Sequence, residues 1–143
     1  MHESLRLRRA GPGATDRGMT TGGRERILVA EDDRDIRDII DFKLGTAGYT
    51  VDLADDGQAA WEAFQAAPPD LAVLDIMMPR LSGIDVLRKI RQSSAPDVPV
   101  LLLSAKGRNA DLAVDIGATD YMAKPFSPRE LLDRVTGILA RAR

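Results

Sequence analysis

Acidic residues follow two short apolar runs of the chain, and these carboxylates are the groups best suited to chemistry. Asp75 ends the run at residues 71–74, and Glu31 and Asp32 follow the run at residues 27–30. A single carboxylate at the end of a strand usually caps or turns the chain, so Asp75 alone decides nothing. Three carboxylates brought together would repel one another, and a divalent cation bound by oxygen ligands, such as Mg²⁺, would relieve that repulsion.

A hydroxyl and an amine stand at the ends of two later apolar runs. Ser104 follows residues 98–103, and Lys124 follows residues 118–123. Neither group is needed to hold a cation, but both suit an anionic partner such as a phosphoryl group. Taken singly, Ser104 is typical of a turn and Lys124 of a solvated surface. The coincidence of all five polar residues at such ends indicates a site.

The composition excludes several kinds of chemistry. Cysteine is absent and the only histidine is His2, which excludes disulfides, thiolate metal sites, Cys nucleophiles and Ser-His-Asp catalysis. No apolar run approaches the roughly 20 residues of a membrane span. Carboxylates, hydroxyls and lysines remain, and sites built only from oxygen suit hard cations such as Mg²⁺.

Charge divides the chain into two parts. Residues 1–24 hold five arginines against two acids and many glycines, whereas the whole chain has a net charge of −2. We expect residues 1–24 to be a disordered basic tail, without the apolar core of a secretory signal and with Met19 as an alternative start. A basic arm for an acidic partner is the other reading of this tail. Residues 25–143 form one acidic domain, which argues against direct nucleic-acid binding.

Strand and helix patterns alternate five times in this domain. Strands are predicted at residues 27–30, 50–54, 71–74, 98–103 and 118–123, with residues 50–54 as an edge strand that has one wetter face. Four helices are predicted from inward-facing residues, namely Ile36, Ile39, Ile40 and Leu44; Ala60, Ala63, Phe64 and Ala67; Val86, Leu87 and Ile90; and Leu131, Leu132, Val135, Ile138 and Leu139. A further helix is predicted at about residues 109–116. Ser82 and Ser127 are expected to cap the helices that follow them, with Asp85 and Glu130 completing capping boxes.

This alternation with short connections predicts an α/β domain with a parallel sheet covered by helices on both faces. The carboxyl ends of parallel strands meet at one edge, where ligands bind in such folds. The five polar residues are therefore expected at a common place.

The domain resembles the response-regulator receiver domains of two-component signalling, closest to the OmpR-type subfamily but without its DNA-binding domain. The matching motifs are Ile-Leu-Val-Ala-Glu-Asp-Asp at 27–33, Asp-Ile-Met-Met-Pro-Arg-Leu-Ser-Gly at 75–83, Leu-Leu-Ser-Ala-Lys at 102–106 and Tyr-Met-Ala-Lys-Pro-Phe-Ser-Pro-Arg-Glu-Leu at 121–131. The resemblance implies a flavodoxin-like, doubly wound (βα)5 fold with strand order 2-1-3-4-5. It also implies a cytoplasmic phospho-acceptor switch, either stand-alone or part of a longer regulator.

The resemblance implies a role for each site residue. Asp75 accepts a phosphoryl group from a histidine kinase or phosphotransfer protein, while Lys124 and Ser104 contact its oxygens. Mg²⁺ is held by Glu31, Asp32, Asp75 and the backbone carbonyl of Met77. Tyr121 is the switch aromatic, and the Lys124–Pro125 peptide is cis. The Met77 side chain cannot orient an attacking water by hydrogen bonding, which predicts slow self-dephosphorylation.

Two departures concern the signalling face. The segment from Ala105 to Gly117 is slightly short for the family, which indicates a truncated or rotated fourth helix. Thr119 replaces an acid usual in the OmpR-type subfamily. The residues that suit that subfamily's charged dimer face are Asp115, Asp120, Arg129 and Arg134. A homodimer through the fourth helix, fifth strand and fifth helix is the expectation.

Two other functions compete with the switch. A Mg²⁺-dependent phosphatase with an Asp nucleophile typically has a second Asp two residues later, where this chain has Met77. A pseudo-receiver would have a broken acidic site, whereas Glu31, Asp32, Asp75 and Lys124 are all present.

Overall fold

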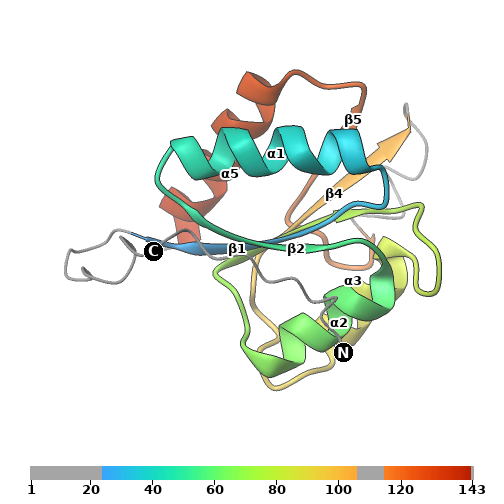
Figure 1. The fold of residues 1–143 in the computed structure, drawn as a ribbon. Coiled ribbons are helices and arrows are strands. Elements are labelled where there is room, and N and C mark those ends of the chain that lie inside the picture. The colour runs from blue at the N-terminus through green and yellow to red at the C-terminus, as the bar shows by residue number, and fades with distance from the viewer. Residues whose placement is uncertain (1–23, 106–114, 143) are drawn as a thin grey trace.

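The computed structural model describes residues 24–105 and 115–142, and they form a parallel five-stranded sheet flanked by helices. The strands are β1 (Arg26–Ala30), β2 (Thr50–Ala54), β3 (Leu71–Asp75), β4 (Val100–Ala105) and β5 (Asp120–Lys124). The helices are α1 (Arg34–Thr46), α2 (Gly57–Ala66), α3 (Gly83–Arg91) and α5 (Pro128–Ala142). The strand order is β2-β1-β3-β4-β5 (Figure 1), so the predicted flavodoxin-like fold is confirmed.

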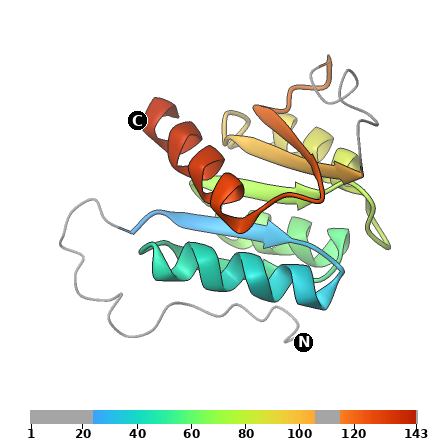
Figure 2. The ribbon, with the colours of Figure 1, turned by 90° about the horizontal axis from the view of Figure 1, so that it is seen from above.

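Helices cover both faces of the sheet. Helices α1 and α5 lie on one face, and α2 and α3 lie on the other (Figures 1 and 2). Side chains alternate along a strand, so Ile27 and Val29 pack toward α1 and α5, whereas Leu28 and Ala30 pack toward α2 and α3. The sheet is therefore buried on both sides, which explains the continuous apolar runs of its central strands.

The helices begin at polar caps. Asp33 and Asp56 are the N-caps of α1 and α2, and their carboxylates accept backbone N–H groups of the first turn. Ser82 and Asp85 form the predicted capping box at the start of α3. Ser127 and Glu130 exchange the same pair of hydrogen bonds at the start of α5. Both predicted capping boxes are confirmed.

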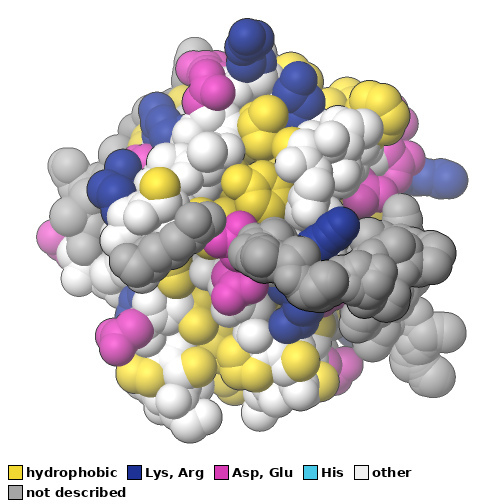
Figure 3. Space-filling model, turned by 90° about the vertical axis from the view of Figure 1, so that its left-hand side faces the viewer, with side chains coloured by type: hydrophobic (Ala, Val, Ile, Leu, Met, Phe, Trp, Pro, Cys, Tyr) yellow, Lys and Arg dark blue, Asp and Glu magenta, His cyan; other side chains and the backbone are white. Residues whose placement is uncertain are grey.

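The prediction that one face of β2 is exposed to solvent is wrong. Asp52 lies on that face but is only 2% exposed, because Arg26 of the neighbouring strand places Nη2 2.8 Å from its Oδ2. The Arg26 backbone N–H also donates to Asp70 at 2.8 Å. These contacts lie where the strands begin, and Figure 3 shows this end of the molecule, where acidic side chains lie beside hydrophobic ones.

The structure also differs from the sequence predictions at two expected core residues and in the bounds of two strands. Ile39 is 49% exposed, because the buried stripe of α1 runs through Ile40 and Leu44. Ala67 is exposed and follows α2 as its C-cap. Ser104 lies within β4 and Lys124 is the last residue of β5, so both strands begin and end later in the chain than the predicted ranges 98–103 and 118–123.

Two sequence predictions concern residues largely outside the described ranges. They are the basic tail at residues 1–24 and the helix at about residues 109–116. Among the helices of residues 24–105 and 115–142, none is long and apolar enough to cross a membrane.

Candidate functional site

The carboxyl edge of the sheet brings the predicted polar residues to one end of the molecule. Asp75 ends β3, Lys124 ends β5, and Glu31 directly follows β1. Buried apolar residues precede Glu31 in β1, at 27–30, and Asp75 in β3, at 71–74, so the packed sheet holds these two carboxylates at defined positions.

Lys124 bridges two buried carboxylates. Its Nζ lies 2.9 Å from Glu31 Oε1 and 3.2 Å from Asp75 Oδ1. The Glu31 and Asp75 side chains are 0% and 4% exposed, and the Lys124 side chain is 22% exposed. One ammonium group therefore faces two carboxylates that solvent barely reaches.

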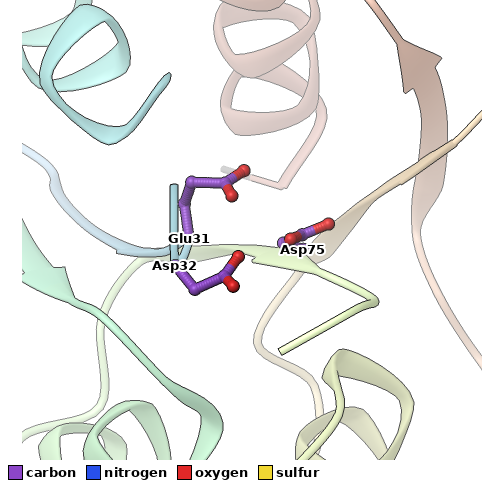
Figure 4. Close-up of side chains that lie close together, drawn as sticks. All are labelled: Glu31, Asp32 and Asp75. Carbon is purple, nitrogen blue, oxygen red and sulfur yellow. The ribbon is translucent and has the colours of Figure 1, made fainter. Parts of the chain in front are cut away.

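Asp32 completes an oxygen cluster suited to a cation. One carboxylate oxygen from each of Glu31, Asp32 and Asp75 lies within 4.8 Å of the others, and the three side chains converge in Figure 4. Asp32 is exposed, whereas the other two are buried. Mg²⁺ prefers hard oxygen ligands and keeps several of its waters, so two buried donors and one exposed donor fit this ion.

Burial controls the ionisation of the cluster. Burial raises the pKa of Glu31, and hydrogen bonds from Lys124 and the Asp33 backbone N–H offset this only in part. Burial likewise raises the pKa of Asp75 against the opposing effect of Lys124, and the charge of Asp32 raises it further. Burial alone would lower the pKa of Lys124, but its contacts with Glu31 and Asp75 outweigh burial and raise it.

The raised carboxyl pKa values predict that Asp75→Asn stabilises the protein in the absence of divalent cations. A carboxyl whose pKa is higher in the folded state favours folding at low pH, and this contribution is lost as pH rises through the raised pKa. Removing the buried charge should therefore raise the free energy of unfolding by about 1 kcal/mol near neutral pH. The gain should shrink as pH falls and disappear well below pH ~4, where the carboxyl is protonated in both states.

Urea unfolding with a chelator present measures this effect. Asp133→Asn in α5 is the control, because Asp133 is exposed and surface changes usually stay within about 0.5 kcal/mol. A destabilised Asp75→Asn protein at neutral pH would contradict the prediction.

Ser104 lies near this cluster on β4, and Tyr121 stands three residues before Lys124 on β5. Ser104 is 2% exposed, and its hydroxyl donates to the Ala105 carbonyl at 3.3 Å. It stands one residue beyond Leu103, the β4 partner of Asp75 in the sheet register. Tyr121 is half-buried and packs on the α2–α3 side of the sheet. Its expected part as a switch remains a prediction.

The Met77 side chain points largely into solvent and is 70% exposed. It follows Asp75 in the loop between β3 and α3. The expected contribution of its backbone carbonyl to the metal site remains a prediction. The Lys124–Pro125 peptide is cis, as predicted.

Sequence reasoning missed two features around the site. Arg37 of α1 donates from Nη1 to the Glu31 carbonyl at 2.9 Å, and no motif signals a helical side chain that reaches a backbone oxygen. An apolar pocket also borders Lys124 and is lined by Ile36, Ile39, Phe126 and Pro128, among others. The sequence prediction placed Ile39 in the core, and an apolar residue left exposed there is what indicates this pocket.

Comparisons with known proteins agree on one family. The sequence model described as "Response regulator receiver domain" matches residues 27–136. The chain is 44% identical over 120 residues to the response regulator MprA of Mycobacterium ulcerans, covering 82% of this chain and 51% of that protein. It is 42% identical over 120 residues to the Bacillus subtilis alkaline phosphatase synthesis transcriptional regulatory protein PhoP, covering 82% and 50%. The chain thus spans about half the length of these curated relatives.

Solved structures give the same result. The receiver domain of the Francisella response regulator 1452 superposes with a TM-score of 0.78 at 35% identity, covering 83% of this chain and 99% of that one. The receiver domain of NtrX from Brucella abortus gives a TM-score of 0.74 at 34% identity, covering 80% and 98%.

Proposed function

The chain belongs to the response regulator receiver domain family, and on that premise we propose that Asp75 accepts a phosphoryl group from a phosphohistidine of a kinase or phosphotransfer protein. The observation that carries this proposal is the Lys124 ammonium, held between Glu31 and Asp75 at 2.9 and 3.2 Å. A fixed cation beside a carboxylate nucleophile is suited to phosphoryl transfer, in which charge spreads over the phosphoryl oxygens.

The transfer forms one bond and breaks one. A carboxylate oxygen of Asp75 attacks phosphorus, the P–N bond to the donor imidazole breaks, and its electron pair remains on that nitrogen. Lys124 turns from Asp75 toward the new phosphoryl oxygens. Glu31, Asp32 and Asp75, with the Met77 carbonyl, would hold Mg²⁺, which would supply positive charge to the transferring group.

Phosphorylation then changes the surface that partners contact. The Ser104 hydroxyl leaves the Ala105 carbonyl for the phosphoryl group, and Tyr121 moves with it, as in a two-state switch. The signal leaves through the face formed by β5 and α5, where Arg134 pairs with Asp120 at 3.3 Å, by altered dimerisation or partner binding. The apolar pocket beside Lys124 supports docking of a protein donor over Asp75. The switch works in the cytoplasm.

Intact mass after incubation with Mg²⁺ and a small phosphodonor tests the function. A stable gain of one phosphoryl group is expected for the natural protein and not for Asp75→Asn. Donor turnover without a gain in mass would indicate a phosphatase, and no modification would indicate a pseudo-receiver. Asp133→Asn makes the same chemical change at an exposed position away from the site and is the control.

Met77 predicts a long-lived phosphoryl group. Its thioether is a weak acceptor and cannot orient an attacking water, whereas an amide can. We expect Met77→Asn to speed the loss of the phosphoryl group severalfold, measured by intact mass after the donor is removed. Met77→Leu should decay like the natural protein. Equal decay in Met77→Asn and Met77→Leu would contradict this reading.

A further inference from the structure

Arg37 makes a directed contact that links helix α1 to the loop carrying Glu31 and Asp32. It is half-buried, and its Nη1 donates to the Glu31 carbonyl at 2.9 Å. Arg34, one turn earlier, contrasts with it. The Arg34 side chain is 79% exposed and lies 3.9 Å from Asp38 of its own helix. Arg37 thus contacts the loop that carries Glu31 and Asp32, whereas Arg34 interacts within its own helix.

The contact holds one of the two peptide planes beside Asp32. A peptide unit is planar, so anchoring the Glu31 carbonyl also orients the nitrogen of Asp32. The second plane is held through the Asp33 N–H, which donates to Glu31 Oε2 at 3.0 Å. Asp33 in turn caps α1 through Asp35 and Ile36. The backbone on both sides of Asp32 is therefore fixed, although its side chain is exposed.

We propose that Arg37 is a positioning residue, which holds the Glu31–Asp32 peptide so that the Asp32 carboxylate stands beside Asp75 ready to bind a divalent cation. This inference rests on the proposed function, because it concerns the cation of the same site. Groups that orient metal ligands typically contribute 10–100-fold to metal affinity.

Electrostatics alone predicts the opposite sign. Arg37 carries a positive charge that repels a cation, so removing the charge would tighten Mg²⁺ binding. Removing the hydrogen bond instead frees the Glu31–Asp32 peptide and weakens binding. The direction of the change in affinity therefore separates positioning from charge.

Calorimetric titration of the whole chain with Mg²⁺ tests the proposal. We expect Arg37→Met to weaken binding about tenfold and Arg34→Met, which loses the same charge from the same helix, to bind like the natural protein. Arg37→Lys keeps the charge and can reach the carbonyl with a single donor, so its affinity should lie between the two. Urea unfolding verifies that each variant is folded, and Arg37→Lys carries the test should Arg37→Met fail to fold.

Unchanged or tighter Mg²⁺ binding by Arg37→Met would overturn the proposal, as would equal weakening in Arg34→Met. Phosphorylation by a small phosphodonor separates this result from the proposed function. In Arg37→Met, more Mg²⁺ should be needed for half-maximal phosphorylation, and saturating Mg²⁺ should restore the natural rate. A natural protein that never gains a phosphoryl group would refute the proposed function, whereas the affinities would still decide the role of Arg37.

Discussion

Lys124→Met is expected to lower the free energy of unfolding by about 3 kcal/mol near neutral pH, because it leaves Glu31 and Asp75 buried without their cation. Both carboxylates are at most 4% exposed and lie within 3.2 Å of the Lys124 ammonium. Water cannot replace the lost partner at such burial. The natural protein already has raised carboxyl pKa values here, and the substitution raises them further.

The pH dependence of this loss identifies its cause. The two carboxyls become neutral as pH falls through their raised pKa values, and the penalty for burying them then disappears. Urea unfolding should therefore show a large deficit for Lys124→Met at neutral pH, and the deficit should shrink as pH is lowered toward the ordinary carboxyl range of about pH 4. Lys43→Met, at the end of α1, is the control for loss of a lysine. A deficit that does not change with pH would indicate lost packing instead.

Lys124→Met should also separate acceptance of the phosphoryl group from signalling. Asp75 keeps its nucleophilic oxygen, but the phosphoryl oxygens lose their cationic partner. We expect slower phosphorylation by a small donor and little response of the β5–α5 face, which oligomeric state with and without donor measures. A full response in this variant would contradict the role proposed for Lys124.

Gly83→Ala is expected to destabilise the protein by about 3 kcal/mol, because its Cβ would overlap the backbone of Asp75. The added atom would lie 2.3 Å from the Asp75 carbonyl oxygen and 2.9 Å from its carbon. Gly83 is the first residue of α3, and its N–H donates to Ile76 at 3.0 Å. Helix α3 therefore cannot retreat without loosening the loop that follows Asp75.

Gly45→Ala provides a control with the opposite sign. Gly45 lies in α1, where an added Cβ would meet nothing within 4 Å among the described residues apart from its chain neighbours and its own helix backbone. Alanine should therefore stabilise the helix by roughly 0.5–1 kcal/mol. Urea unfolding of the two variants compares the same chemical change in two surroundings. Gly83→Ala should also accept phosphoryl groups more slowly when assayed where it is fully folded. A free energy of unfolding for Gly83→Ala equal to that of the natural protein would contradict the close approach of α3 to Asp75.

Much of the fold could be predicted because apolar periodicity reports burial. Residues 27–30 and 71–74 are apolar throughout, and β1 and β3 are the central strands with helices on both faces. The same logic failed for Asp52, since alternation cannot show that Arg26 of the next strand neutralises it. It failed also for Ile39, because helical spacing leaves the edge of a buried stripe undefined.

The acidic cluster could be anticipated because the ends of parallel strands share an edge. Asp75 and Lys124 are strand ends and Glu31 follows one, so topology alone brings them together. Arg37 and Gly83 could not be anticipated, because each acts on a backbone carbonyl. Every residue has a backbone carbonyl, so the type of the partner residue gives no hint that such a contact exists.

The site forms only when the whole sheet has folded, because its residues come from the first, third and last strands. Glu31 follows the first strand and Lys124 ends the last, while Asp75 stands on the strand between them in sequence. A chain still emerging during synthesis contains Asp75 before Lys124 exists, and a chain that has lost β5 keeps Asp75 without its cation. The phosphoryl transfer to Asp75 that we propose depends on Lys124, and it therefore requires the completed sheet.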